Sequence, residues 1–282
     1  MRVTTLIENR PSKTDSHLVA EWGLSLHITF NGHNILFDTG SSGSFAKNAE
    51  HLSVNVASID TAVLSHHHFD HGGGLRCLLN ANDSVKVYLG EAPSGECFIR
   101  LLPFIKKYIG LEKALITDYP ERFKTVNTPT EILPDVFVFP HISGPYPTPA
   151  GNQRLLVRRD GKLTPDNFAH EIVMAIKENN KLIIFTGCSH HGVLNMVDTV
   201  ARVFEGIPVK AVIGGFHLVG SPPFNFMAGS RREVEDLAKK ILDYPIDRTY
   251  TGHCTGTKAF AVLKTVMGER ITDLKTGSCF EV

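Results

Sequence analysis

A run of histidines at the end of an apolar segment constrains this chain more than any other feature. Residues 65–75 read SHHHFDHGGGL. His66 and His68 are two apart, so in extended backbone both side chains project to the same side and can bind one metal ion. Asp70 and His71 follow after a turn and can offer an oxygen and a nitrogen to a second ion. The glycines let the backbone pass close beneath the metals. The pattern therefore predicts a metal site at a strand end.

The periodicity of apolar residues predicts two kinds of organisation along the chain. A strand hairpin is expected over residues 24–38, with Asn31-Gly32 as its turn. Further strands are expected over residues 61–65, 84–89, 136–139, 171–177, 182–187, 209–213 and 249–251. Helices are expected over residues 45–52, 96–111 (kinked or broken by Pro103), 193–204, 231–242 and 256–267. A hairpin-rich half followed by strand–helix alternation predicts an α+β fold with two sheets between helices. We expect one domain over residues 1–282, with an insertion of helix and loop around residues 91–150.

Composition excludes several classes of partner. Lys plus Arg and Asp plus Glu both number 29, so no global field favours nucleic acid or an anionic membrane. No apolar run approaches the roughly 20 residues that cross a bilayer, and the first residues lack the pattern of a secretory signal. Five scattered cysteines without a CxxC pair predict free thiols and a cytoplasmic location.

The histidine motif, His-x-His-x-Asp-His after a strand, resembles the signature of the metallo-β-lactamase superfamily. Other segments resemble a branch of it related to dihydropterin ribofuranosyl-aminobenzene phosphate synthase; they are residues 21–26 (EWGLSL), 35–40 (ILFDTG), 186–192 (TGCSHHG), 213–218 (IGGFHL) and 251–256 (TGHCTG). The resemblance implies an αβ/βα four-layer sandwich with metals at one edge of two mixed sheets.

The same resemblance indicates further metal ligands at later strand ends. His253 matches the last histidine of the superfamily motifs, which ligates the second metal. Cys188 stands where most superfamily hydrolases have an aspartate that bridges both metals, and a thiolate can also ligate zinc or iron. Alternatively, His190 completes the first metal site and Cys188 only packs; His141 is a third candidate. The sequence leaves these alternatives open.

Two other polar residues follow predicted strands. His217 is expected near the metals, where it binds substrate or donates a proton, although a buried structural histidine fits the pattern nearly as well. Asp38 is expected to accept the N–H of a ligand imidazole, so that the histidine presents its other nitrogen to the metal.

These residues favour hydrolysis of a small, phosphate-bearing substrate. One or two divalent ions, zinc first and manganese or iron as alternatives, would lower the pKa of a shared water from 15.7 towards ~7. Asp70 would orient that water and move its proton. No nucleic-acid or membrane partner is expected, and a homo-oligomer is left open.

Two rival functions remain at this stage. The first is a transferase that condenses a dihydropterin diphosphate with a ribofuranosyl-aminobenzene phosphate, for which Trp22, Tyr146, Phe216, Phe224 and Phe226 could supply stacking faces. The second is a di-iron redox or sensor protein, in which Cys188 would replace an acidic bridging residue.

Overall fold

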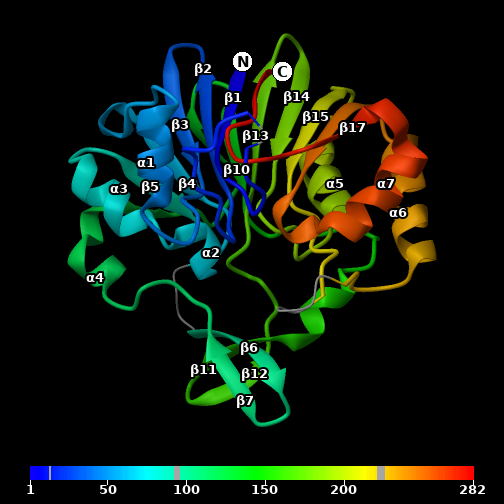
Figure 1. Ribbon diagram of the computed structural model, residues 1–282, viewed down its shortest axis with the longest axis horizontal. Coiled ribbons are helices and arrows are strands. Elements are labelled where there is room, and N and C mark those ends of the chain that lie inside the picture. The colour runs from blue at the N-terminus through cyan, green and yellow to red at the C-terminus, as the bar shows by residue number, and fades with distance from the viewer. Residues whose placement is uncertain (13, 92–95, 221–225) are drawn as a thin grey trace.

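Two seven-stranded sheets form the centre of the protein (Figure 1). The structure is a computed structural model and describes residues 1–12, 14–91, 96–220 and 226–282. The first sheet has the strand order β18 (Cys279–Glu281), β1 (Arg2–Ile7), β2 (Ser25–Phe30), β3 (His33–Phe37), β4 (Thr61–Leu64), β5 (Lys86–Leu89) and β8 (Phe123–Thr125). The second has the order β17 (Ile271–Asp273), β16 (Ile246–Thr251), β15 (Val209–Gly214), β14 (Lys181–Phe185), β13 (Val173–Glu178), β10 (Val136–Phe139) and β9 (Thr130–Leu133).

Helices cover the outer face of each sheet (Figure 1). On the first sheet these include α1 (Ser44–His51) and α3 (Leu75–Ala81), with the short α2 (Phe69–Gly72) and α4 (Leu115–Asp118) nearby. On the second sheet they are α5 (Val193–Val203), α6 (Arg231–Asp243) and α7 (Thr257–Met267). These layers confirm the expected arrangement of two mixed sheets between helices.

The inner faces of the two sheets share one apolar core. Phe37 of β3 packs against Phe185 of β14, with ring centroids 6.0 Å apart, and both side chains are fully buried. Because β14 is covered on both faces, it reads as a nearly continuous apolar run rather than an alternating one. Separate clusters fill the space between each sheet and its helices.

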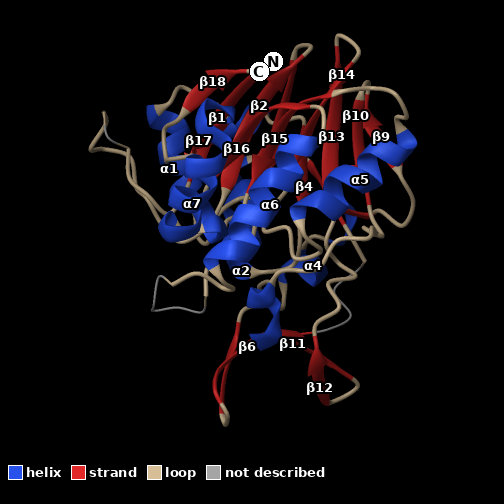
Figure 2. Cartoon of the chain, turned by 90° about the vertical axis from the view of Figure 1, so that its right-hand side faces the viewer, coloured by secondary structure: helices blue, strands red, loops and turns tan. Residues whose placement is uncertain are grey.

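A small third sheet lies beyond one edge of the sandwich (Figure 2). Its order is β12 (Lys162–Pro165), β11 (Leu155–Arg159), β6 (Glu96–Leu102) and β7 (Ile105–Tyr108). The helix expected over residues 96–111 is therefore wrong. Pro103 stands in the turn between two strands, and β6 is held by pairing with the distant β11.

No helix in the described ranges is long and apolar enough to span a membrane.

The strands position the polar residues at one edge. Parallel pairing places the carboxyl ends of β3 and β4 together in the first sheet, and those of β14, β15 and β16 together in the second. All five ends lie on the side that faces the small sheet (Figure 1). The loops that follow these strands carry the predicted site residues.

Candidate metal centre

A first group of donors is formed by His66, His68 and His190. Nε2 of His66 lies 3.0 Å from Nδ1 of His68, and the ring centroids of His66 and His190 are 4.9 Å apart. One nitrogen from each ring lies within 4.8 Å of the others. All three side chains are buried, His66 completely. The group joins the end of β4 to the loop after β14, and so spans both sheets.

A second group lies directly beside the first. Nε2 of His71 is 3.1 Å from Nε2 of His253 and 3.2 Å from Sγ of Cys188. Nε2 of His253 is 3.5 Å from Oδ2 of Asp70. His253 has a φ of 48°, in a tight turn after β16 that aims its ring back toward the first sheet. The two histidines therefore face each other with Cys188 and Asp70 at their sides.

The protonation states suit metal binding. Burial, reinforced by the neighbouring imidazoles, holds the pKa values of His66 and His190 well below 6.5. Burial also lowers the pKa of His68 to about 3. Burial opposes ionisation of Asp70, but hydrogen bonding to His253 and the adjacent imidazoles lower its pKa below the usual range. Neutral imidazoles and an ionised carboxylate are the forms that ligate metals.

The pKa of His71 shifts in the opposite direction to those of His66, His68 and His190. Its ring is fully buried, yet the adjacent Asp38 carboxylate outweighs that burial and raises the pKa of His71 to about 9. A metal ion at Nε2 of His71 must therefore displace a proton. Burial raises the pKa of Cys188 well above 9, so the same holds for its thiol.

The donor set fits one or two divalent metal ions. Nε2 of His190 is buried and has no hydrogen-bond partner within the described residues. An unsatisfied buried nitrogen is costly, and coordination would remove that cost. Imidazole nitrogens, a carboxylate and a thiolate are ligands that zinc, iron and manganese sites use in various combinations.

A shell of oxygen acceptors orients these rings. Four histidines place Nδ1 beside an oxygen: His66 at 2.9 Å from Ser65 Oγ, His71 at 2.7 Å from Asp38 Oδ2, His190 at 2.9 Å from Asn152 Oδ1, and His253 at 3.0 Å from Asn9 Oδ1. Each of these four rings thereby donates from Nδ1 and turns its Nε2 lone pair toward the centre. Asp38 thus occupies the place expected for an imidazole acceptor.

Other residues that orient the site were not predicted from the sequence. Nε1–H of Trp22 donates to Oδ2 of Asp70 over 2.8 Å. The buried carboxylate of Glu171 accepts the backbone N–H of both His190 and His191. Asn9 and Asn152 belong to no recognisable motif, and only the fold brings them to His253 and His190.

The remaining predicted histidines divide into two kinds. His217 lies near the centre, with its ring centroid 4.2 Å from that of His190, and both of its ring nitrogens are buried without a partner in the part of the chain that is described. His141 is exposed, and its Nε2 lies 3.0 Å from the Asn127 carbonyl oxygen. His141 therefore does not complete the site.

A cavity of about 520 Å³ opens onto both groups of donors. Its walls are largely apolar and come from the small sheet and from loops of both large sheets: Trp22, Phe69, Ile99, Leu101, Ile109, Leu155 and Val219. Lys107 is the one cationic side chain among the described lining residues. His68, Asp70, Cys188, His190, His217 and Cys254 form its metal-facing side.

Of the five aromatic residues considered as stacking faces, Trp22 lines this cavity. Phe216 is buried in the core, and Tyr146 hydrogen-bonds to Tyr244 elsewhere. Phe226 is 41% exposed. Phe224 lies outside the described residues, as does most of the segment around it.

Comparisons with known proteins indicate the family of the chain. Residues 24–253 match the family model of the metallo-beta-lactamase superfamily. The chain is 30% identical over 275 residues to 7,8-dihydropterin-6-methyl-4-(beta-D-ribofuranosyl)-aminobenzene-5'-phosphate synthase of Methanocaldococcus jannaschii, covering 92% of this chain and 89% of that protein.

Solved structures share the fold over the whole chain. The crystal structure of Tm1679, a metal-dependent hydrolase of the beta-lactamase superfamily, has a TM-score of 0.80 and 26% identity, covering 100% of this chain and 99% of that one. Zn(2+)-bound PqqB from Methylobacterium extorquens has a TM-score of 0.58 and 14% identity, covering 100% of both chains. The second likeness concerns the fold alone.

Proposed function

Because the chain belongs to the metallo-β-lactamase superfamily, we propose that it is a metal-dependent hydrolase of small, phosphate-bearing substrates. One observation carries the proposal: two adjacent groups of buried donors face a cavity large enough for a small molecule. The proposal includes a cytoplasmic location, since free thiols persist in a reducing compartment. It involves no nucleic-acid or membrane partner and is compatible with a homo-oligomer.

His66, His68 and His190 would hold one ion, and Asp70, His71 and His253 the other, with Cys188 as a further ligand beside His71. Bound divalent metal supplies an activated water and stabilises negative charge on a substrate oxygen.

The chain's own residues would orient the reactants and move the protons. Oδ2 of Asp70, which accepts the Nε1–H of Trp22, would take a proton from the attacking water. His217 reaches the same cavity with both ring nitrogens free of other described partners, and can protonate the leaving group. Lys107 lies on the opposite wall, on the small sheet.

The cavity indicates a substrate with two unlike parts. Apolar walls favour an aromatic or aliphatic body, and the Lys107 ammonium favours an anionic group at the small sheet. A phosphate ester with an apolar body meets both conditions: its reacting phosphate would lie on the metal-facing side, and a second anionic group would reach Lys107.

The test is hydrolysis of aromatic phosphate esters by zinc-loaded protein. We expect release of nitrophenol from p-nitrophenyl phosphate or bis(p-nitrophenyl) phosphate by the wild type. We also expect retention of that rate in His141→Ala, which changes an exposed histidine away from the site. The proposal is wrong if neither zinc-, manganese- nor iron-loaded protein hydrolyses any ester in a broad phosphate panel.

The similarity to the M. jannaschii synthase supports a second candidate, a transferase. In that reaction a dihydropterin diphosphate would condense with a ribofuranosyl-aminobenzene phosphate and release pyrophosphate. The distinguishing measurement is release of pyrophosphate and of phosphate, with each substrate alone and with both together. Release that requires both substrates identifies the transferase, whereas phosphate release from one substrate alone identifies the hydrolase.

A further inference from the structure

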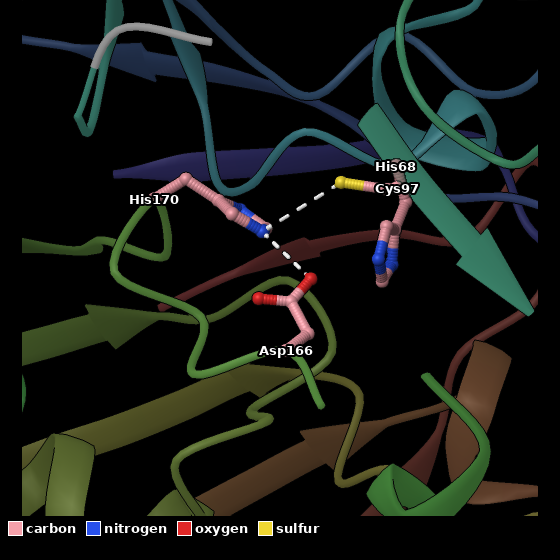
Figure 3. Close-up of side chains that lie close together, drawn as sticks. All are labelled: His68, Cys97, Asp166 and His170. Atoms are coloured by element: carbon pink, nitrogen blue, oxygen red, sulfur yellow. Dashed lines mark hydrogen bonds and ion pairs between the residues drawn. The ribbon is translucent and has the colours of Figure 1, made fainter. Parts of the chain in front are cut away.

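A buried polar group beside the metal centre joins the proposed ligand His68 to three residues that have no role in the function proposed above. It consists of His68, Cys97, Asp166 and His170, and we call it the Asp166 group (Figure 3). One donor atom from each residue lies within 4.8 Å of the others. Nε2 of His170 is 3.3 Å from Oδ2 of Asp166 and 3.9 Å from Sγ of Cys97. The Asp166 side chain is 0% exposed, although no Lys or Arg among the described residues is paired with it.

Four such donors could suggest another metal site, but the proton positions argue against it. The backbone N–H of His67 donates to Nδ1 of His170 over 3.1 Å. Nδ1 therefore carries the lone pair, and the neutral ring has its proton on Nε2, where it is donated to Asp166. A metal ion bound there would have to displace that proton and leave an imidazolate. The group is better suited to accept N–H donors than to bind a cation.

His68 is the exception among the histidines of the metal centre. The other four donate from Nδ1 to an oxygen of Ser65, Asp38, Asn152 or Asn9. His68 instead turns Nδ1 toward His66, and its Nε2 is buried without a hydrogen-bond partner within the described ranges. With a metal ion on Nδ1, Nε2 of His68 must carry a proton and needs an acceptor.

We propose that Asp166 is the positioning residue for His68 and accepts the Nε2–H of that ring when the metal site is filled. The proposal rests on the metal site of the proposed function. An oxygen of Asp166 already lies within 4.8 Å of a His68 ring nitrogen. A side-chain rotation or one water closes the remaining gap. The carboxylate is held in place, since Oδ2 accepts from Nε2 of His170 and Oδ1 accepts the backbone N–H of Phe168 over 2.8 Å.

Cys97 is the only other acceptor in the group and is the weaker one. Burial, together with the nearby Asp166 charge, raises the pKa of the Cys97 thiol to about 12, so the sulfur is neutral. A neutral thiol accepts hydrogen bonds poorly, whereas a carboxylate accepts them strongly. The negative charge on Asp166 also makes His68 a more basic ligand.

The test compares zinc affinity among four variants, measured by competition with a chromophoric chelator. We expect Asp166→Ala to weaken zinc binding about 10- to 100-fold, the usual effect of removing an acceptor behind a ligand histidine. Asn152→Ala, which removes the acceptor of His190, should give a loss of similar size. Asp166→Asn keeps one acceptor oxygen, so its zinc affinity should lie between those of Asp166→Ala and wild type. Cys97→Ala should remain within about threefold of wild type.

Imidazole ¹H–¹⁵N spectra of the zinc-loaded wild type give a readout independent of any variant's folding. We expect His68 to be protonated on Nε2 with a hydrogen-bonded proton resonance, and His170 to be protonated on Nε2. Folded Asp166→Ala that binds zinc as tightly as wild type would overturn the inference. So would an additional equivalent of zinc that Cys97→Ala loses, because that result identifies a metal site. Wild type that binds no zinc would instead refute the proposed function.

Discussion

At the scale of single residues, the first donor group depends on three buried imidazoles, those of His66, His68 and His190, whose pKa values are lowered by burial. His66 and His68 lie two residues apart after one strand, whereas His190 reaches them from the other sheet. Removing one of these rings removes a ligand without touching the apolar core. The consequences should therefore appear in metal binding and turnover before they appear in folding.

His68→Ala should abolish turnover while leaving the secondary structure of the protein intact. The first donor group retains only two histidines in this variant, so at least one equivalent of bound metal should be lost. Metal analysis, circular dichroism and rate measurement on the same sample check this expectation, with His141→Ala as the control. Wild-type turnover in His68→Ala would contradict the assigned roles.

The metal-free protein should lose stability as the pH falls from 7 to 5.5. The folded-state pKa values of four buried histidines lie below the unfolded value of about 6.5; they are His66, His67, His68 and His190. Below pH 6.5 only the unfolded chain binds protons on these rings, so the unfolding free energy falls as the pH falls. Each proton bound only by the unfolded chain costs about 1.4 kcal/mol per pH unit.

His71, whose pKa is raised, acts in the opposite sense. Its contribution is present below pH 6.5 and is lost as the pH rises through about 9. One such group cannot offset four. Urea unfolding of metal-free protein at the two pH values measures the balance, and equal unfolding free energies would show that the buried rings are not held neutral.

The sequence predicts part of this centre because part of it is local. The spacing of His66, His68, Asp70 and His71 is visible within one segment. Asn9, Asn152 and Asp166 stand alone in their segments and acquire a role only when distant strands meet. The choice among Cys188, His190 and His141 likewise needed three-dimensional positions.

At the scale of elements, the predictable strands and helices are those with strong periodicity. The hairpins of β2 with β3 and of β13 with β14, and the helices α5, α6 and α7, lie within a few residues of their expected positions. β6 was mistaken for a helix because its apolar residues do not alternate strictly, and its partner β11 lies far along the chain. Long-range pairing, rather than local propensity, decides that segment.

The small sheet should control substrate affinity rather than metal binding. Lys107 of β7 lines the cavity, and its Nζ lies 5.9 Å from the ring centroid of Phe69. We expect Lys107→Ala to raise KM for an anionic substrate about tenfold, because one partly exposed ion pair to a substrate group is lost. Steady-state kinetics check this, with Lys106→Ala as the matched control on the same strand. Equal KM values in the two variants would remove Lys107 from the substrate site.

At the scale of the whole molecule, the metal centre connects the two sheets. The proposed ligands come from the loops after β4 in the first sheet and after β14 and β16 in the second. A ligand set that spans both layers exists only in the folded state. Metal binding should therefore stabilise the entire sandwich and not just one loop.

Removal of metal by a chelator should lower the unfolding free energy. At a free metal concentration 100 times Kd, binding to the folded state alone contributes about 2.7 kcal/mol. Chemical denaturation with and without bound zinc at pH 7 measures the difference. An unchanged unfolding free energy would mean that the sandwich does not depend on the centre.

The central claim, that two adjacent donor groups bind metal, is tested most directly by metal content per chain. Plasma mass spectrometry of protein purified without added metal gives both stoichiometry and identity. We predict close to two equivalents of zinc, manganese or iron in wild type and fewer in His68→Ala. One equivalent in wild type would mean that the group containing Cys188 does not hold an ion of its own. No metal, even after reconstitution, would contradict the account.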